Sequence, residues 1–402
     1  MFKKIAMMLA GAVLILTSCA PSINNDDEVV QNEDENEQEQ NSIVSSNQLS
    51  EEDYRTILPY RPSASRGVIT NQMGNRVDID EMETGLRRLS KEYFDPEQYF
   101  FEEGQYLTSD MLYNWLDTYP TEERLQELEK MIENEDISEE AVKEEKSALN
   151  PPLNEKTATK EDYEDNPKYL THILEQNFLT KNDDNTMELA GASIGIALKS
   201  VYTFKAEGNT HHRDISKSEM MEKGKEIAQT VLERVRSIEE LNNVPIMIAL
   251  YREEDQSSPV PGNFVAKTGV EAGKATIDEW ETVNEENVLF PSDEGKEKYY
   301  DTQQLVQNFA SRIEEYFPNY VGVIGKGFYI DEELKKLTLE IPLEFYGKGE
   351  IIGFTQYTYG LVEEMFQDYY ELEVKIKSNE KMEGLIYREA GDDEVTVHVY
   401  DS

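Results

Sequence analysis

The stretch LTLEIPLEF at residues 337–345 carries the clearest fold signal, because apolar side chains occupy every second position. Such alternation is typical of a β-strand with one buried face. Residues 354–366 then place apolar side chains three or four positions apart, which predicts a helix, and residues 372–376 alternate again. The sequence therefore predicts a strand, a helix and a second strand in this order.

The same order of elements occurs earlier in the chain. Residues 194–204 and 244–250 alternate broadly as strands, and residues 220–238 between them have the spacing of a helical face. We predict an α/β (α+β) fold in which two similar strand-helix-strand units share a roll-like sheet, with helices mainly on one face. This C-terminal domain is expected to span residues 165–402 and to contain an internal duplication.

A smaller, mainly helical N-terminal region is predicted over residues 53–150. Within it, residues 80–93 place their apolar side chains on one helical face. Pro151 and Pro152 then interrupt a highly charged stretch. Prolines in polar surroundings are typical of a linker, so the sequence predicts a domain junction near residues 146–165.

The N-terminus has the pattern of a lipoprotein signal peptide over residues 1–18. Lys3 and Lys4 precede the apolar residues 5–16, a run shorter than the roughly 20 residues of a membrane span. The run ends in LTSC, which matches the bacterial lipobox. We predict cleavage between Ser18 and Cys19, followed by acylation of Cys19 with diacylglycerol and a further chain such as palmitate.

Residues 19–52 read as an acidic tether between this lipid anchor and the folded part. They are rich in Asp, Glu, Asn and Gln, and no Lys or Arg occurs after the signal peptide before Arg55. Such a segment buries too little apolar surface to offset its chain entropy, so we predict that it is disordered and extended. The protein is then expected on the extracytoplasmic face of a Gram-positive cell membrane.

The composition excludes several classes of function. The 402 residues include 83 acidic and 39 basic side chains, for a net charge of -44, which argues against binding nucleic acid through a basic surface. One cysteine cannot form an internal disulfide or a Cys-rich zinc site. The expected partners are the lipid bilayer through Cys19, the lipoprotein-processing enzymes, and cell-wall material or a small ligand.

No segment assembles a convincing catalytic set. The GASIG sequence at residues 191–195 fits the nucleophile-elbow pattern, but the predicted strand follows Ser193 instead of preceding it. The glycines of residues 347–353 are spaced one residue too far apart for a dinucleotide loop. The adjacent histidines at residues 211–212 point apart on a strand or helix. We therefore predict a noncatalytic protein with no metal and no cofactor.

Arg61 and Arg66 form the candidate ligand patch. Unpaired guanidinium groups on so acidic a protein would hold a carboxylate or phosphate, whereas the alternative is salt bridges to neighbouring acids. Two further function classes stay open. A wall-associated hydrolase would need a carboxylate pair with one raised pKa. A solute- or peptide-binding lipoprotein would need a deep apolar pocket at the junction of the two repeats.

Three sequence blocks carry a family resemblance: YRTILPYRPSASRG at residues 54–67, EMETGLRRLSKEYFDPEQYFFEEGQYL at residues 81–107 and GIALKSVYTF at residues 195–204. With the lipobox and the acidic tether, they make the chain resemble the CamS family of Firmicute lipoproteins, the sex pheromone precursors. The resemblance implies an α/β roll in the C-terminal part. It also implies that the end of the cleaved signal peptide is trimmed to a hydrophobic heptapeptide sensed by donor cells of another species. The corresponding residues here are Ala12, Val13, Leu14, Ile15, Leu16, Thr17 and Ser18.

Overall fold

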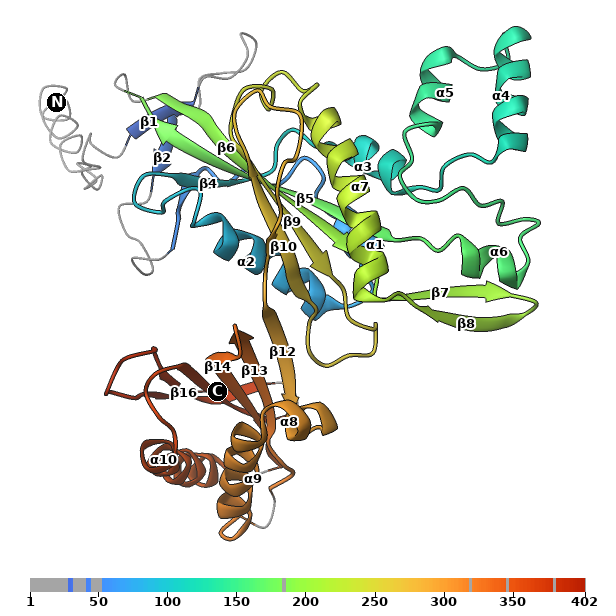
Figure 1. The fold of residues 1–402 in the computed structure, drawn as a ribbon. Coiled ribbons are helices and arrows are strands. Elements are labelled where there is room, and N and C mark those ends of the chain that lie inside the picture. The colour runs from blue at the N-terminus through green and yellow to red at the C-terminus, as the bar shows by residue number, and fades with distance from the viewer. Residues whose placement is uncertain are drawn as a thin grey trace, which may run out of the picture.

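The folded chain forms two lobes, each built on its own β-sheet (Figure 1). The computed structural model describes residues 28–31, 41–44, 53–182, 186–317, 320–344, 347–378 and 381–401. The predicted signal peptide and Cys19 lie outside these ranges.

The larger sheet has nine strands in the order β1-β2-β3-β4-β5-β6-β9-β10-β11. Its centre is mixed, because β5 and β6 are antiparallel, β6 and β9 are parallel, and β9 and β10 are antiparallel. The strands are β1 (Glu28–Gln31), β2 (Asn41–Val44), β3 (Arg55–Leu58), β4 (Phe100–Glu103), β5 (Leu170–Lys181), β6 (Thr186–Leu198), β9 (Ile246–Arg252), β10 (Asn263–Val270) and β11 (Glu281–Thr282).

Two of these strands, β1 and β2, fall inside the segment predicted as a disordered tether, residues 19–52. There the backbone is extended and paired, with β1 antiparallel to β2 and parallel to β6. The remaining residues of this segment up to residue 52 lie outside the described ranges, so for them the tether stays a prediction.

Helices cover both faces of the larger sheet. Helix α2 (Arg76–Ser90) begins at Asn75, whose side chain accepts a hydrogen bond from the Val77 N–H, and it buries Met82 and Leu86 against one face. Helix α7 (Lys217–Val235) buries its apolar stripe in a separate core on the other face. The expectation of cover mainly on one face is wrong for this sheet. Strands such as β9 are buried along almost their whole length, as cover on both faces requires.

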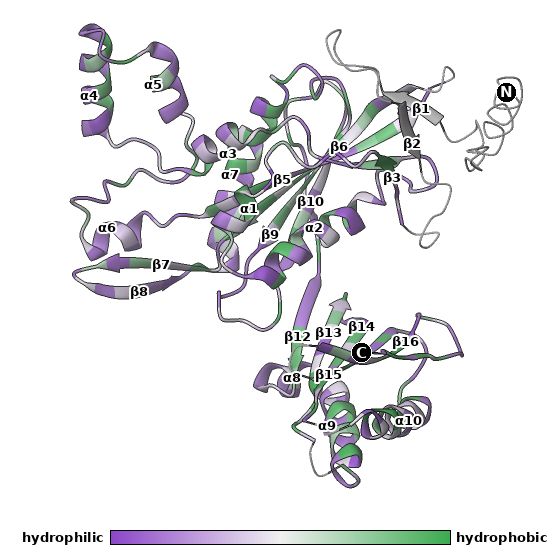
Figure 2. Cartoon of the chain, turned by 180° about the vertical axis from the view of Figure 1, so that it is seen from behind, coloured by the Kyte–Doolittle hydropathy of each residue, from purple (hydrophilic) through white to green (hydrophobic). Residues whose placement is uncertain are grey.

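The segment between β4 and β5 is helical, as predicted. Helix α3 (Ser109–Leu116) packs on the sheet, whereas α4 (Glu122–Glu133) and α5 (Glu139–Glu145) project from it and are mainly hydrophilic (Figure 2). Helix α6 (Lys160–Asp165) and the hairpin of β7 (Val201–Ala206) and β8 (Asn209–Asp214) project at a second place (Figure 1).

The hydrogen-bonded sheet runs across the junction predicted near residues 146–165. Strand β4, from the predicted N-terminal region, pairs with β5, which opens the predicted C-terminal domain. Between them, Pro151 and Pro152 occupy a loop. The two cores divide instead between β11 and the next strand, β12 (Glu285–Phe290). The boundaries of a separate N-terminal region, residues 53–150, stay a prediction.

The smaller sheet has six strands in the order β12-β13-β14-β15-β16-β17. Helices α9 and α10 pack their apolar sides on it, and strand β14 alternates between buried and more exposed residues, as one-sided cover requires. The strands are β12 (Glu285–Phe290), β13 (Ile324–Ile330), β14 (Glu333–Pro342), β15 (Glu371–Ser378), β16 (Lys381–Arg388) and β17 (Thr396–Val399). The helices are α8 (Asp293–Lys298), α9 (Tyr300–Glu314) and α10 (Lys348–Met365).

The predicted strand-helix-strand units are both present, and their surroundings match as well. In the larger lobe, hairpin β5-β6 leads through α7 to hairpin β9-β10, with β6 and β9 parallel. In the smaller lobe, hairpin β13-β14 leads through α10 to hairpin β15-β16, with β14 and β15 parallel. The mixed α/β fold with two similar units is confirmed. The expectation of one shared sheet is wrong, because each unit belongs to a sheet of its own.

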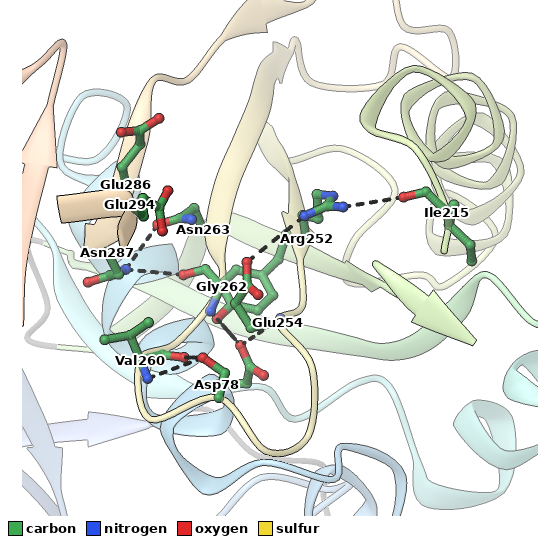
Figure 3. A network of polar contacts seen from close by, with 12 residues as sticks. Asp78, Ile215, Arg252, Glu254, Val260, Gly262, Asn263, Glu286, Asn287 and Glu294 are labelled. Atoms are coloured by element: carbon green, nitrogen blue, oxygen red, sulfur yellow. Dashed lines mark hydrogen bonds and ion pairs between the residues drawn. The ribbon is translucent and has the colours of Figure 1, made fainter. Parts of the chain in front are cut away.

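Polar contacts connect the two lobes near the ends of α2 and β10. Arg88 on α2 forms ion pairs with Glu81 and with the buried Glu285 of β12, at 2.7 and 3.0 Å. Its guanidinium also lies over the ring of Phe328 on β13. Close by, the Asn287 side chain donates to the Gly262 carbonyl at 3.1 Å (Figure 3).

Candidate functional site

The structure separates the two arginines of the predicted ligand patch. Arg66 lines a pocket of about 330 Å³, whereas Arg61 does not line it and forms an ion pair with Glu102 at 3.5 Å. The pocket lies between the segment 60–70, helix α2 and strands β4 and β5. Its lining residues are Tyr60, Ser63, Ser65, Arg66, Gly67, Ile69, Thr70, Arg76, Glu83, Arg87, Phe101, Glu103, His172, Leu174, Glu175 and Gln176.

A short polar loop forms one wall of the pocket. Glu103, at the end of β4, accepts hydrogen bonds from the Tyr60 hydroxyl and from the Ser63 N–H, the latter at 2.7 Å. Burial, and then the hydrogen bond to Glu103, raise the pKa of Tyr60 to about 12. The loop ends at Gly67, whose φ of 91° is readily adopted only by glycine, and helix α1 (Val68–Gln72) begins there. The loop is thus fixed to β4.

On the opposite side of the pocket, Glu175 of β5 fixes the backbone of residues 105–107. Its carboxylate accepts hydrogen bonds from three consecutive backbone N–H groups, those of Gln105, Tyr106 and Leu107, at 3.1, 3.1 and 2.6 Å. Burial raises the pKa of Glu175, while these donors act in the opposite direction. Since its carboxylate is already engaged by the backbone, we assign it a structural role.

Three guanidinium groups surround the pocket, and they differ in their partners. Arg76 pairs with Asp80 at 2.8 Å. Arg87 lies over the ring of Phe101 at 4.3 Å, and its buried Nε has no hydrogen-bond partner among the described residues. Arg66 is exposed at the rim. Across the part of the chain that the structure describes, neither Arg66 nor Arg87 forms an ion pair with a carboxylate.

Glu83 is the carboxylate that faces these cations without a direct ion pair in the described part of the chain. It lies one turn before Arg87 on α2 and is only partly exposed. Burial, followed by the nearby charge of Glu103, raises the pKa of Glu83 above the usual range. Charges of both signs are therefore present in the same small space.

Strand β5 places two neutral polar side chains in the pocket. His172 and Gln176 are 1% and 3% exposed. Their Nδ1 and Oε1 atoms, respectively, have no hydrogen-bond partner among the described residues. Burial lowers the pKa of His172 to about 3, so the imidazole is uncharged at neutral pH. A histidine with so low a pKa is a poor general base near pH 7, and the arrangement favours binding over acid-base chemistry.

Sequence reasoning placed Arg66 in the candidate patch but missed Glu83, Arg87, His172 and Gln176. The signal that was available is the polar composition of HILEQN, at residues 172–177. On a strand buried on both sides, such residues need partners or a cavity.

The residues weighed for catalysis occupy structural positions. Ser193 is fully buried on β6, with its Oγ 2.7 Å from that of Ser90. Gly347 is the residue before helix α10. His212 lies on the exposed strand β8 and hydrogen-bonds to Thr203 at 2.9 Å, while His211 stacks with Phe204. These residues are not brought together.

Two buried carboxylates with raised pKa values come nearest to the acidic pair of the hydrolase alternative. Asp78 accepts a hydrogen bond from the Gly262 N–H at 2.7 Å (Figure 3). It also accepts one from the Tyr251 hydroxyl at 2.6 Å. Burial raises its pKa, and burial raises that of Glu253 to about 6. Neither residue lines the pocket of Arg66. Asp78 instead fixes the loop before β10 to α2.

A second, more open pocket of about 670 Å³ lies in the smaller lobe and is lined by several tyrosines. Its cations are already matched by carboxylates. Lys298 lies 3.1 and 2.9 Å from Glu286 and Glu294, and Lys335 lies 2.7 Å from Glu333. The charge of this pocket is thus balanced internally, in contrast to the pocket of Arg66. Neither pocket is the deep apolar one at the repeat junction that the solute-binding alternative expected.

The described ranges contain neither a membrane-spanning helix nor a cluster of metal ligands. No helix there is both long enough and apolar enough to cross a membrane. Nor does that part of the chain contain a group of three or more His, Cys, Asp and Glu side chains placed to hold a metal ion. The lipidation site Cys19, the cleavage site after Ser18 and the predicted heptapeptide, residues 12–18, lie outside the described residues.

Comparison with known proteins gives the family. Residues 60–394 match the family model described as CamS sex pheromone cAM373 precursor. A crystal structure of a sex pheromone precursor from Lactobacillus salivarius is similar, with a TM-score of 0.77 and 28% identity over 90% of this chain and 99% of that chain. A structure of the C-terminal domain of the sex pheromone staph-cAM373 precursor from Staphylococcus aureus has a TM-score of 0.68 and 28% identity, covering 83% of this chain and all of that chain. No curated protein matches the chain. Because the family match spans most of the sequence, the chain belongs to the CamS sex pheromone cAM373 precursor family.

Proposed function

We propose that the protein is a lipoprotein on the outer face of the membrane, that its leader is processed to a pheromone-like heptapeptide, and that its folded part binds a small charged ligand without catalysis. The observation that carries the proposal is family membership combined with the sequence LTSC at residues 16–19. Neither feature alone would link the leader to the folded part.

Lipid attachment at Cys19 would supply the membrane affinity. Each buried methylene contributes about 0.8 kcal/mol, and stable anchoring takes more than one acyl chain. An acylated Cys19 with diacylglycerol and a third chain meets this condition. The lobes would then stand outside the cell.

The predicted peptide, residues 12–18, is short and almost entirely apolar. Such a peptide partitions reversibly into a bilayer and is small enough for uptake by an oligopeptide transporter. Its release would require cleavage before Cys19 and a second cut before Ala12. The pheromone role of the relatives is the basis for extending this to the present chain.

The folded part is assigned a binding role because its polar pocket combines a neutral, buried histidine with charges that have no ion pair in the described part of the chain. A hydrolase is not favoured, since Asp78 and Glu253 are buried elsewhere and serve the packing of a loop and a strand. Binding at this pocket needs no bond cleavage and no cofactor.

The anchoring proposal is tested by replacing Cys19 with serine and analysing membranes and culture medium by mass spectrometry. We expect wild type in the membrane fraction with an acylated first residue, and residues 12–18 in the medium. Cys19→Ser should abolish both the acylated species and the peptide. Ser18→Ala, which keeps a small residue at the cleavage site, should be processed and release a peptide lighter by one oxygen atom. Normal processing of Cys19→Ser would overturn the proposal.

A further inference from the structure

The pocket of Arg66 contains two cations, Arg66 and Arg87, without carboxylate partners among the described residues. In this chain of 83 acidic and 39 basic residues, many described Lys and Arg side chains instead pair with an acid, as Arg76 does with Asp80 and Arg88 with Glu81. Arg87 is half-buried over Phe101, and Arg66 stands at the rim of the same pocket. Among the described residues neither has an ion pair. A ligand that brings a carboxylate would match these two guanidinium groups.

A ligand carrying only negative charge would meet repulsion on the other side of the pocket. Glu83 lines it, and Glu103 lies close enough for its charge to raise the pKa of Glu83. Glu103 is hydrogen-bonded to Tyr60 and Ser63, but in the described part of the chain Glu83 has no direct cationic partner. A ligand that brings an ammonium group would match Glu83. A purely cationic ligand would in turn face Arg66 and Arg87.

The neutral polar groups of β5 point to the same ligand class. His172 and Gln176 are almost fully buried, line the pocket and each keep one polar atom without a partner in the described chain. Buried polar atoms are nearly always hydrogen-bonded in folded proteins, and these two atoms are available to a bound ligand or to water. Amide or ammonium N–H groups and carboxylate oxygens supply such partners.

The size of the pocket limits the ligand. About 330 Å³ is at the lower end of the range for small-molecule sites. Leu174 and Phe101 add an apolar surface to the lining, which suits a small side chain.

We propose that this pocket binds a small zwitterion of the amino-acid or short-peptide class, with its carboxylate at Arg66 and Arg87 and its ammonium group at Glu83. The proposal rests on the binding role given to the folded part and names the ligand class. His172 and Gln176 would then hydrogen-bond to the backbone-like polar groups of the ligand.

The test measures binding of alanyl-alanine to the full chain in detergent by titration calorimetry. Free alanine distinguishes an amino acid from a peptide as the source of the zwitterion. N-acetyl-alanyl-alanine lacks the ammonium group, alanyl-alanine amide lacks the carboxylate, and acetate is the simple anion. We expect binding of alanyl-alanine or alanine with a dissociation constant of about 1 mM or lower, and at least about tenfold weaker binding of both blocked peptides.

Variants then assign each end of the ligand. Arg66→Gln and Arg87→Gln should each weaken alanyl-alanine about tenfold but should not weaken the binding of its cationic amide. Glu83→Gln should weaken alanyl-alanine but should not weaken the binding of the anionic N-acetyl peptide. Arg312→Gln removes the same charge in the smaller lobe, where Arg312 pairs with Glu364, and should have no effect. Circular dichroism of each variant confirms that it is folded.

Each outcome decides the proposal. If neither alanine nor alanyl-alanine binds, or if the blocked peptides bind equally well, the zwitterion assignment is overturned. If acetate binds as tightly as alanyl-alanine and Arg87→Gln weakens both equally, the zwitterion assignment is overturned. The pocket would then be a site for simple anions. Lipid anchoring and release of the heptapeptide are measured separately, so their failure is distinguishable from failure here.

Discussion

His172 carries an imidazole inside the larger sheet, where burial lowers its pKa to about 3. An unfolded chain would titrate this group near pH 6.5. Below that value the unfolded state therefore binds a proton that the folded state does not. The contribution of the neutral histidine to the free energy of unfolding is therefore fully present above pH 6.5. It decreases progressively as the pH falls toward 3.

We predict that His172→Gln flattens the pH dependence of the free energy of unfolding. By the linkage relation, the free energy of unfolding of wild type should fall by about 2 kcal/mol between pH 7 and pH 5 because of His172. This part of the fall should be absent in the variant. Urea unfolding at several pH values measures the slope. An identical slope in both proteins would show that His172 is not held neutral by burial.

Glu253 provides a control of opposite sign. Burial raises its pKa to about 6, so the folded state keeps a proton that the unfolded chain releases above about pH 4.5. Its contribution to stability therefore falls as the pH rises from about 4.5 to about 6. Glu253→Gln should remove this loss and make the stability of the protein rise more steeply with pH in that range.

At the level of secondary structure, helices α7 and α10 each connect two parallel strands, but they pack on their sheets at different distances. On α7, a Cβ at Gly224 would lie 2.5 Å from Leu198 Cδ1 and 3.2 Å from Leu250 Cδ1. On α10, a Cβ at Gly360 would meet no atom within 4 Å. A glycine is therefore required by packing in one helix and merely tolerated in the other.

We predict opposite effects for the same substitution in these helices. Gly360→Ala should stabilise the protein by about 0.5–1 kcal/mol, because alanine loses less backbone entropy in a helix. Gly224→Ala has the same favourable effect on backbone entropy, but overpacking against Leu198 and Leu250 costs about 1–3 kcal/mol. This substitution should therefore destabilise the protein. Thermal unfolding followed by circular dichroism tests both. Equal stabilisation by both substitutions would mean that α7 is not packed as closely as described.

Apolar periodicity in the sequence predicts the helices and strands that have one polar side. It does not predict strands that are buried on both sides. Helix α2 and strands β14 and β15 were expected close to their observed bounds, because their apolar residues mark one face. Strand β5 was missed. Its central residues 172–177 include His, Glu, Gln and Asn, a polar composition that is not typical of a buried strand. Of the proposed ligand contacts only Arg66 could be predicted, since the others lie on α2 and β5, which long-range packing brings beside segment 60–70.

On the scale of the whole molecule, the repeated hairpin-helix-hairpin order explains why the sequence suggests one shared sheet. Local periodicity specifies each unit but not the partner of its outer strands. The outer partners differ, since β4 joins the first unit at β5 and β12 joins the second at β13. Two sheets result, and their relative position depends on a few polar contacts.

Arg88 is the centre of these contacts, and its removal should weaken the coupling of the lobes. Glu285 is buried, and its pKa is raised by burial while Arg88 opposes that rise. Loss of one partner from a buried ion pair costs about 3 kcal/mol or more, because the other charge stays desolvated. We therefore predict that Arg88→Gln destabilises the protein and that its urea unfolding separates into two transitions, one for each lobe.

The pH dependence identifies Glu285 as the cause. Without Arg88, the pKa of Glu285 rises further, so the folded state holds a proton that the unfolded chain releases. The loss of stability should then be larger near pH 8 than near pH 5, where protonation of Glu285 relieves the buried charge. In the double variant Arg88→Gln/Glu285→Gln this difference between the two pH values should become smaller, while the loss of the ion pair between Arg88 and Glu81 is common to both variants. A loss in Arg88→Gln that does not vary with pH would instead assign the coupling to the contact between Arg88 and the Phe328 ring.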